Sequence, residues 1–221
     1  TLSGAVMGIT NIIDLLLIMQ RLLSLGYSEQ SASALYGNYT TLAVPFLNLV
    51  ISLVGPLAVA ALPVITEQHV KGCGAELQKR FEMIFHLCAF IAIPCAVAFM
   101  IFPVEILTLL FKDESALVGA PLLCLMAPSV VFLSLLTMLN TALEATSHAR
   151  VPLISMSVGA VAKLILGYVL IGREEIGILG APIGTAVCYG IAFIISVFFA
   201  LKYGEIKFCA LVSLYKPLLI S

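Results

Sequence analysis

Long apolar runs separated by short polar loops dominate this chain of 221 residues. Hydrophobic residues make up 62% of the chain and charged residues only 10%, whereas soluble domains carry roughly 25% charged residues. A helix needs about 20 apolar residues to cross a hydrocarbon core about 30 Å thick, and runs of that length recur throughout. The sequence therefore predicts an all-α integral membrane protein that crosses the bilayer several times.

The apolar runs and the prolines within them define the expected spans. We expect six spans, at about residues 2–23, 35–65, 81–111, 116–143, 151–171 and 177–201, with a further membrane helix beginning in 208–221. The second and third spans are too long for one straight crossing, and they contain Pro45, Pro56, Pro63, Pro94 and Pro103. Proline interrupts helical hydrogen bonding, so we expect kinks there, or a crossing followed by a short interfacial turn near 103–111. Apolar runs at both ends of the sequence suggest part of a longer transporter.

The basic residues of the loops predict which side of the membrane each loop faces. Six of them fall on one side of the predicted topology, namely Lys71, Lys79, Arg80, Arg150, Lys202 and Lys207. Only three fall on the other side, namely Arg21, Lys112 and Arg173. Cytoplasmic loops carry the excess of lysine and arginine. Loops 66–80 and 144–150 are therefore predicted to be cytoplasmic, with the first span running outward.

Lys163 is a charge near the middle of the fifth predicted span. A lysine at the centre of a bilayer costs roughly 2.5–3.5 kcal/mol on insertion scales. On a helical wheel it shares its side with Ser155, Gly159 and Gly167, while aliphatic residues occupy the opposite side. This pattern favours a lysine that faces a cavity or a buried partner. The alternative is a lysine that extends its side chain to the membrane surface.

Other polar residues within the spans could join Lys163. Asp14, which lies near Thr10 and Asn11 in the first span, is the candidate partner for Lys163 or a protonatable site; the alternative is a structural hydrogen bond between helices. Asn48 begins a polar stripe that is suited either to a cavity wall or to helix packing. Glu144 and Arg150 are expected to form an ion pair at the membrane boundary.

Several function classes are disfavoured by composition and motifs. A net charge of −1 gives no overall basic field for nucleic acid. No phosphate-binding glycine loop, zinc-protease motif or paired catalytic carboxylates occur in the sequence, and no cofactor is expected. The six cysteines include no CxxC pair, so disulfides and a zinc site are not expected. A transporter or flippase is the favoured class, and an enzyme is not.

Four segments resemble one family of membrane exporters. The stretch "ALYGNYTTLAVPFLNLVISLVGPLAVAALPVITE", residues 34–67, is similar to the eighth helix of the multidrug/oligosaccharidyl-lipid/polysaccharide exporter superfamily. The branch it resembles is the stage V sporulation protein B group of polysaccharide exporters, which is related to the lipid II flippases. Segments 9–37, 150–171 and 177–195 are similar to the seventh, eleventh and twelfth helices, and a lysine commonly occupies the middle of the eleventh.

This resemblance implies a fold, a substrate class and partners. It implies the MATE-like fold of fourteen helices, in which this chain is the second six-helix lobe and the N-terminal lobe is its partner. The implied function is alternating-access export of a polyprenyl-diphosphate-linked saccharide across a bacterial plasma membrane, in contact with membrane lipids and with possible Na⁺ or H⁺ coupling. A diphosphate in a low-dielectric region needs a positive partner, so the expected substrate-binding residues are Lys163, Arg21, Asn48 and Arg150, and the expected ion-coupling residue is Asp14.

Two other functions fit the same residues. A cation-coupled multidrug exporter of the same fold would place acidic residues, Asp14 and Glu144, in its central cavity. A purely structural membrane bundle would pair its polar stripes fully within the lobe. One central lysine against one central aspartate favours the anionic substrate.

Overall fold

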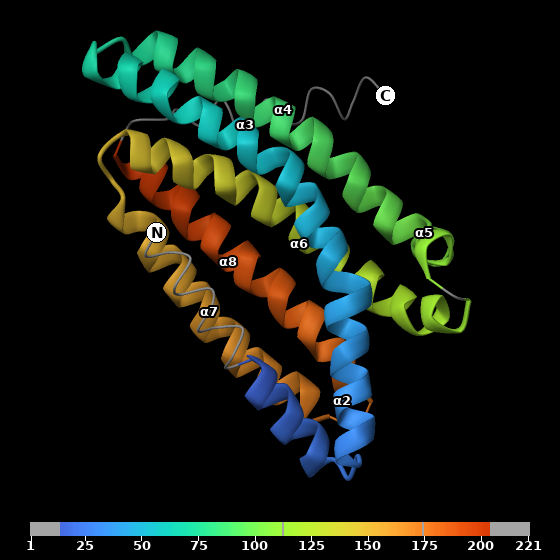
Figure 1. Ribbon diagram of the computed structural model, residues 1–221. Coiled ribbons are helices and arrows are strands. Elements are labelled where there is room, and N and C mark those ends of the chain that lie inside the picture. Colours follow the sequence, from blue (N-terminus) through green and yellow to red (C-terminus); the bar gives the residue numbers. More distant parts are fainter. Residues whose placement is uncertain (1–13, 112, 174, 204–221) are drawn as a thin grey trace.

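The structure is a bundle of long helices. The computed structural model describes residues 14–111, 113–173 and 175–203, and these ranges contain helices and no strand. A first helix covers 14–24, and it is followed by α2 (Glu29–Asn38), α3 (Val44–Val70), α4 (Gly74–Ile101), α5 (Pro103–Leu110), α6 (Asp113–Ala145), α7 (Arg150–Ile171) and α8 (Gly180–Lys202) (Figure 1). Within these ranges, five helical segments are long and apolar enough to cross a membrane. The predicted all-α membrane fold is confirmed.

The observed helices extend several of the expected spans. The second span begins at Glu29 and ends at Val70, because polar α2 continues into α3. The third is divided into α4 and the short α5. This division confirms a crossing followed by a short turn, since Pro103 occupies the first turn of α5, where its missing N–H costs nothing. Residues 2–13 of the first expected span, and the expected helix start in 208–221, lie outside the described residues.

Prolines inside these helices have different effects. Pro56, Pro63 and Pro94 lie within α3 and α4 without ending either helix. Pro45 follows a π-helical turn, Tyr39–Ala43, in which the Val44 N–H donates to the Tyr39 carbonyl five residues back. A proline ring crowds the carbonyl four residues before it and cannot donate to it. The wider π turn accommodates Pro45 and keeps α2 and α3 continuous.

Helix α6 is the centre of the bundle. It packs against α3, α4 and α5 on one side and against α8 on the other, and α7 packs mainly on α8. In the most apolar 18-residue segment of α6, about 67% is buried inside the bundle, against 28–39% for the corresponding segments of the other four candidate spans. Figure 1 shows the α3–α4 pair diverging from the α7–α8 pair on either side of α6. Residues of α3, α6, α7 and α8 line the site described below.

The turns separate the described basic residues into two groups. The α3–α4 turn, the α6–α7 turn and the C-terminal end of α8 lie at one end of the bundle (Figure 1). Lys71, Lys79, Arg80, Arg150 and Lys202 belong to these segments or border them, and all five are exposed. Arg21 and Arg173 belong to segments at the opposite end. The helix arrangement thus gathers loops 66–80 and 144–150 on one side.

Candidate functional site

Helix α7 has one buried face and one face turned to the surroundings. Ser155, Gly159 and Gly167 are buried, as the helical wheel predicts. The aliphatic side is exposed, with Val161 56% and Ile165 60% accessible. Apolar side chains that face outward on a membrane helix contact lipid, and small residues allow helices to approach closely. The polar face of α7 therefore points into the bundle and brings Lys163 with it.

Lys163 forms an ion pair with Asp14. The Lys163 ammonium donates a hydrogen bond to the Asp14 carboxylate, which is contributed by the helix at 14–24. Each side chain is only 14% exposed. This geometry confirms the interpretation of Lys163 as a buried, paired residue and excludes a lysine extended to the membrane surface. A buried charge needs such a partner, because desolvating an unpaired charge costs several kcal/mol.

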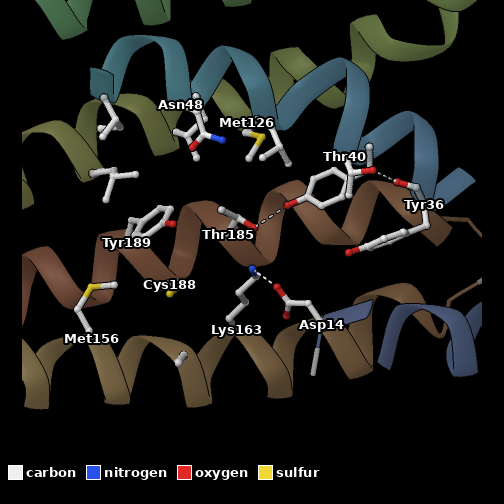
Figure 2. Close-up of a pocket in the computed structure, with 16 residues that line it drawn as sticks. Asp14, Tyr36, Thr40, Asn48, Met126, Met156, Lys163, Thr185, Cys188 and Tyr189 are labelled. Carbon is white, nitrogen blue, oxygen red and sulfur yellow. Dashed lines mark hydrogen bonds and ion pairs between the residues drawn. The ribbon is translucent and has the colours of Figure 1, made fainter. Parts of the chain in front are cut away.

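The pair lies in the wall of a cavity between the two sides of the bundle. The cavity has a volume of about 390 Å³. Its lining comes from the helix at 14–24, α2, the π turn, α3, α6, α7 and α8, and Figure 2 shows how the labelled members face it. The lining residues are Asp14, Tyr36, Tyr39, Thr40, Val44, Leu47, Asn48, Ile51, Met126, Leu133, Met156, Ala160, Lys163, Thr185, Cys188 and Tyr189. Its walls are mainly apolar with a few polar tips, which is typical of ligand sites.

A hydrogen bond between Tyr39 and Thr185 joins the π turn to α8 beside the ion pair (Figure 2). The two hydroxyl oxygens are 3.1 Å apart and buried. Thr185 Oγ1 also lies 3.0 Å from the Ala181 carbonyl, to which it donates its only proton. Tyr39 is therefore the donor to Thr185.

Sequence reasoning missed several cavity residues. Tyr36, Tyr39 and Thr40 are spaced i, i+3 and i+4, and Thr185 and Tyr189 are spaced i and i+4. Each set therefore shares one face of its helix, and all five line the cavity. These residues could have been predicted from this spacing of polar and aromatic side chains.

Asn48 lies on the cavity wall contributed by α3. This position agrees with the cavity-wall alternative for the stripe that it begins. The next polar residue of the stripe, Ser52, satisfies its hydroxyl locally by donating to the Leu49 carbonyl at 2.7 Å. Asn48 is thus the member of the stripe that a ligand in the cavity could reach.

Arg21 lies outside the cavity lining. Its Nε donates to the Tyr168 carbonyl at 3.0 Å, and its guanidinium carbon lies 3.5 Å from the centroid of the Tyr168 ring. Tyr168 belongs to the last turn of α7, where a cation stabilises the free carbonyls of the helix end. The structure therefore gives Arg21 a role in fixing the first helix to the end of α7.

Arg150 also lies away from the cavity. It is exposed at the start of α7. Within the described ranges no ion pair joins Arg150 to Glu144, so the predicted boundary pair is wrong. Both side chains are exposed to solvent at opposite ends of a turn in which Ser147 has a φ of 66°. An exposed ion pair contributes little to the free energy of folding, so the two side chains would gain little by approaching each other.

The described part of the chain offers no cluster of three or more His, Cys, Asp or Glu side chains that could hold a metal ion. The chemistry available at the cavity is that of one ammonium, one carboxylate, one thiol, hydroxyl groups and one carboxamide. These groups can bind and release an ionic or polar ligand.

Comparisons with known proteins agree with the membrane fold. The MatE family model matches residues 39–169, which is more than half of the chain. Stage V sporulation protein B of Bacillus subtilis (strain 168) is 25% identical over 168 residues, which cover 76% of this chain and 32% of that protein. The chain thus spans about a third of the length of this curated relative. No solved structure gives a significant match.

Proposed function

Because the chain belongs to the MatE family, we propose that it is one lobe of a membrane exporter that moves a polyprenyl-diphosphate-linked saccharide by alternating access. In this proposal, the cavity faces an N-terminal lobe of the same protein, and the two lobes rock against each other in a bacterial plasma membrane. The similarity to stage V sporulation protein B supports the flippase branch of the family. The chain itself is a multi-pass membrane protein.

The observation that carries this proposal is the ammonium group of Lys163 in the cavity wall. A diphosphate that crosses the bilayer needs a positive partner in a region of low dielectric constant. Lys163 provides a compact charge with three donors. Asn48 lines the same cavity and can add a hydrogen bond. The apolar tail of the substrate would remain in lipid along the outer faces of the helices.

The ion pair suggests how substrate binding is coupled to a cation. While Asp14 holds Lys163, the pair carries no net charge. A diphosphate can take Lys163 only if the Asp14 carboxylate loses its partner, which is costly in a buried site. A proton or Na⁺ on Asp14 would remove that cost. We therefore assign ion coupling to Asp14 and binding of the anionic substrate to Lys163.

A second candidate function rests on Asp14 itself. An acidic side chain in a cavity that also contains three tyrosines suits an organic cation, because aromatic faces attract cations. A cation-coupled multidrug exporter would use Asp14 and would not need Lys163. Export of the saccharide lipid therefore requires Lys163, whereas export of organic cations does not.

Transport by the protein in its full natural length, reconstituted in lipid vesicles, tests the proposal. Wild type and the variants Lys163→Arg, Lys163→Met and Lys163→Glu are compared for transfer of undecaprenyl-diphosphate-linked saccharide between leaflets and for uptake of ethidium. We expect Arg to retain saccharide-lipid transfer, and Met and Glu to abolish it. Wild-type transfer by Lys163→Met, or ethidium uptake that persists in Lys163→Met, would contradict the proposal and favour the multidrug exporter.

A further inference from the structure

Two polar side chains in the cavity have no hydrogen-bond partner among the described residues. Tyr189 on α8 and Asn48 on α3 point into the cavity from opposite walls (Figure 2). Within the described ranges, neither the Tyr189 hydroxyl nor the Asn48 carboxamide takes part in a hydrogen bond, and the Tyr189 ring is paired with no other aromatic ring. Tyr39, by contrast, is buried and already bonded to Thr185. Tyr189 and Asn48 are therefore available to a ligand.

The packing of α7 against α8 fixes the position of Tyr189 relative to Lys163. A Cβ on Gly184 would lie 3.6 Å from the Lys163 carbonyl oxygen, so Gly184 on α8 and Lys163 on α7 lie at the same position along the two packed helices. Tyr189 follows Gly184 by five residues, which is about 7.5 Å along a helix. When the anionic end of a ligand contacts Lys163, the chemical group bonded directly to that anionic end therefore lies within reach of Tyr189.

We propose that Tyr189 and Asn48 form a subsite for the sugar ring attached directly to the diphosphate of the substrate. This inference rests on the proposed function, because it places the diphosphate on Lys163. A pyranose ring has C–H groups on its faces and hydroxyl groups around its rim. The Tyr189 ring provides a flat apolar surface with a polar tip, and the Asn48 carboxamide provides two donors and an acceptor for the rim.

The size and charge of the cavity support a single sugar ring. Its volume of about 390 Å³ is near the lower end of the range of about 300–1,000 Å³ for small-molecule sites. A diphosphate with one sugar is of this class, and a long oligosaccharide is not. An organic cation could also stack on Tyr189, but it would gain no attraction from the Lys163 ammonium, which in this inference binds the anionic end of the ligand. The first sugar is thus the part of the saccharide that this lobe recognises.

Binding to two lipids that differ by one sugar tests the subsite. The protein in its full natural length is titrated with undecaprenyl diphosphate and with undecaprenyl diphosphate carrying one N-acetylglucosamine. We expect Tyr189→Leu to weaken binding of the sugar-bearing lipid about three- to tenfold, the range expected for loss of a stacked ring, and to leave the sugar-free lipid unchanged. Tyr189→Phe keeps the ring and should remain close to wild type.

Two further variants control for folding and for general effects of the substitution. Phe198→Leu on α8 removes an aromatic ring that is 62% exposed and does not line the cavity, and it should bind both lipids as wild type does. Asn48→Leu should lose affinity for the sugar-bearing lipid only, so the subsite remains testable if Tyr189→Leu does not fold.

The outcomes separate this inference from the proposed function. If wild type binds both lipids but Tyr189→Leu and Asn48→Leu weaken both equally, or weaken neither, the subsite is overturned and the proposed function stands. If wild type binds neither lipid, the proposed function fails, and the subsite fails with it.

Discussion

At the scale of single residues, the Lys163–Asp14 pair gives a prediction about stability. Both side chains are 14% exposed, so removing one of them leaves an uncompensated charge in a largely buried site. Breaking a buried pair in this way costs about 3–5 kcal/mol, whereas replacing both members is often close to neutral. We expect Lys163→Met and Asp14→Asn each to lower the thermal unfolding midpoint in detergent, and the double variant to recover most of the loss without recovering transport.

The exposed pair between Lys71 and Glu67 is the matched control for this prediction. It has the same chemistry but lies at the end of α3, with side chains 57% and 58% exposed. Exposed pairs are screened by water and salt, so Lys71→Met should leave the unfolding midpoint unchanged. Equal losses for Lys71→Met and Lys163→Met, or no recovery in the double variant, would show that burial of the Lys163–Asp14 pair does not explain its effect.

The hydrogen bond from Tyr39 to Thr185 gives an asymmetric prediction. Tyr39→Phe removes the donor and leaves Thr185 bonded to Ala181, so it should cost only about 0.5–1.5 kcal/mol of unfolding free energy. Thr185→Val leaves the buried Tyr39 hydroxyl without an acceptor, and this should cost about 1–3 kcal/mol. Chemical denaturation of the purified protein measures both. Thr66→Val, whose hydroxyl bonds only within its own exposed helix turn, is the control; a larger loss for Tyr39→Phe than for Thr185→Val would contradict the assigned donor.

At the scale of helices, the contact between α7 and α8 depends on the glycine at 159. A Cβ on Gly159 would lie 2.6 Å from the Cys188 carbonyl oxygen, whereas a Cβ on Gly184 of the same interface would meet nothing closer than 3.6 Å. Forcing atoms into a packed interface typically costs about 1–3 kcal/mol. We therefore expect Gly159→Ala to separate α7 from α8 and to lower the unfolding midpoint, and Gly184→Ala to be tolerated. Tolerance of both alanines would show that the two helices are not packed as closely as described.

Helices also show which parts of the site the sequence could predict. The inward face of α7 was predictable because residues 155, 159, 163 and 167 recur with the helical period. The short α5 was predictable because Pro103 cannot continue the preceding helix. The polar extension to Glu29 was not, because α2 is too polar to resemble a membrane span. Tyr189 was missed although Thr185, one helical turn before it, marks the same face of α8 as polar.

At the scale of the whole molecule, local periodicity does not specify which helices become neighbours. Asp14 and Lys163 are 149 residues apart, and their pairing was predictable only because each charge needs a partner within the membrane. Nothing in the pattern of α6 distinguishes it as the central helix, since its hydropathy resembles that of the other spans. The contact partner of Arg21 could not be predicted either, because its contact with Tyr168 depends on how the first helix packs against the end of α7.

The orientation of the whole lobe gives the last prediction. The turns that contain loops 66–80 and 144–150 lie at one end of the bundle (Figure 1), together with most of the described basic residues. The positive-inside rule places that end in the cytoplasm. Cys73 is exposed in the α3–α4 turn, and Glu175 is exposed before α8 at the other end. Each position can therefore report the side that it faces.

A membrane-impermeant maleimide should label these two positions from opposite sides of the membrane. In a variant that keeps Cys73 as its only cysteine, labelling should require opened cells, because the positive-inside rule predicts that this thiol faces the cytoplasm. In a cysteine-free variant carrying Glu175→Cys, labelling should occur in intact cells. Unchanged labelling after full denaturation is the control for protein amount. The opposite pattern would reverse the lobe in the membrane, so that Tyr189 would lie on the outer side of Lys163 and a substrate entering from the cytoplasm would meet the lysine before the sugar subsite.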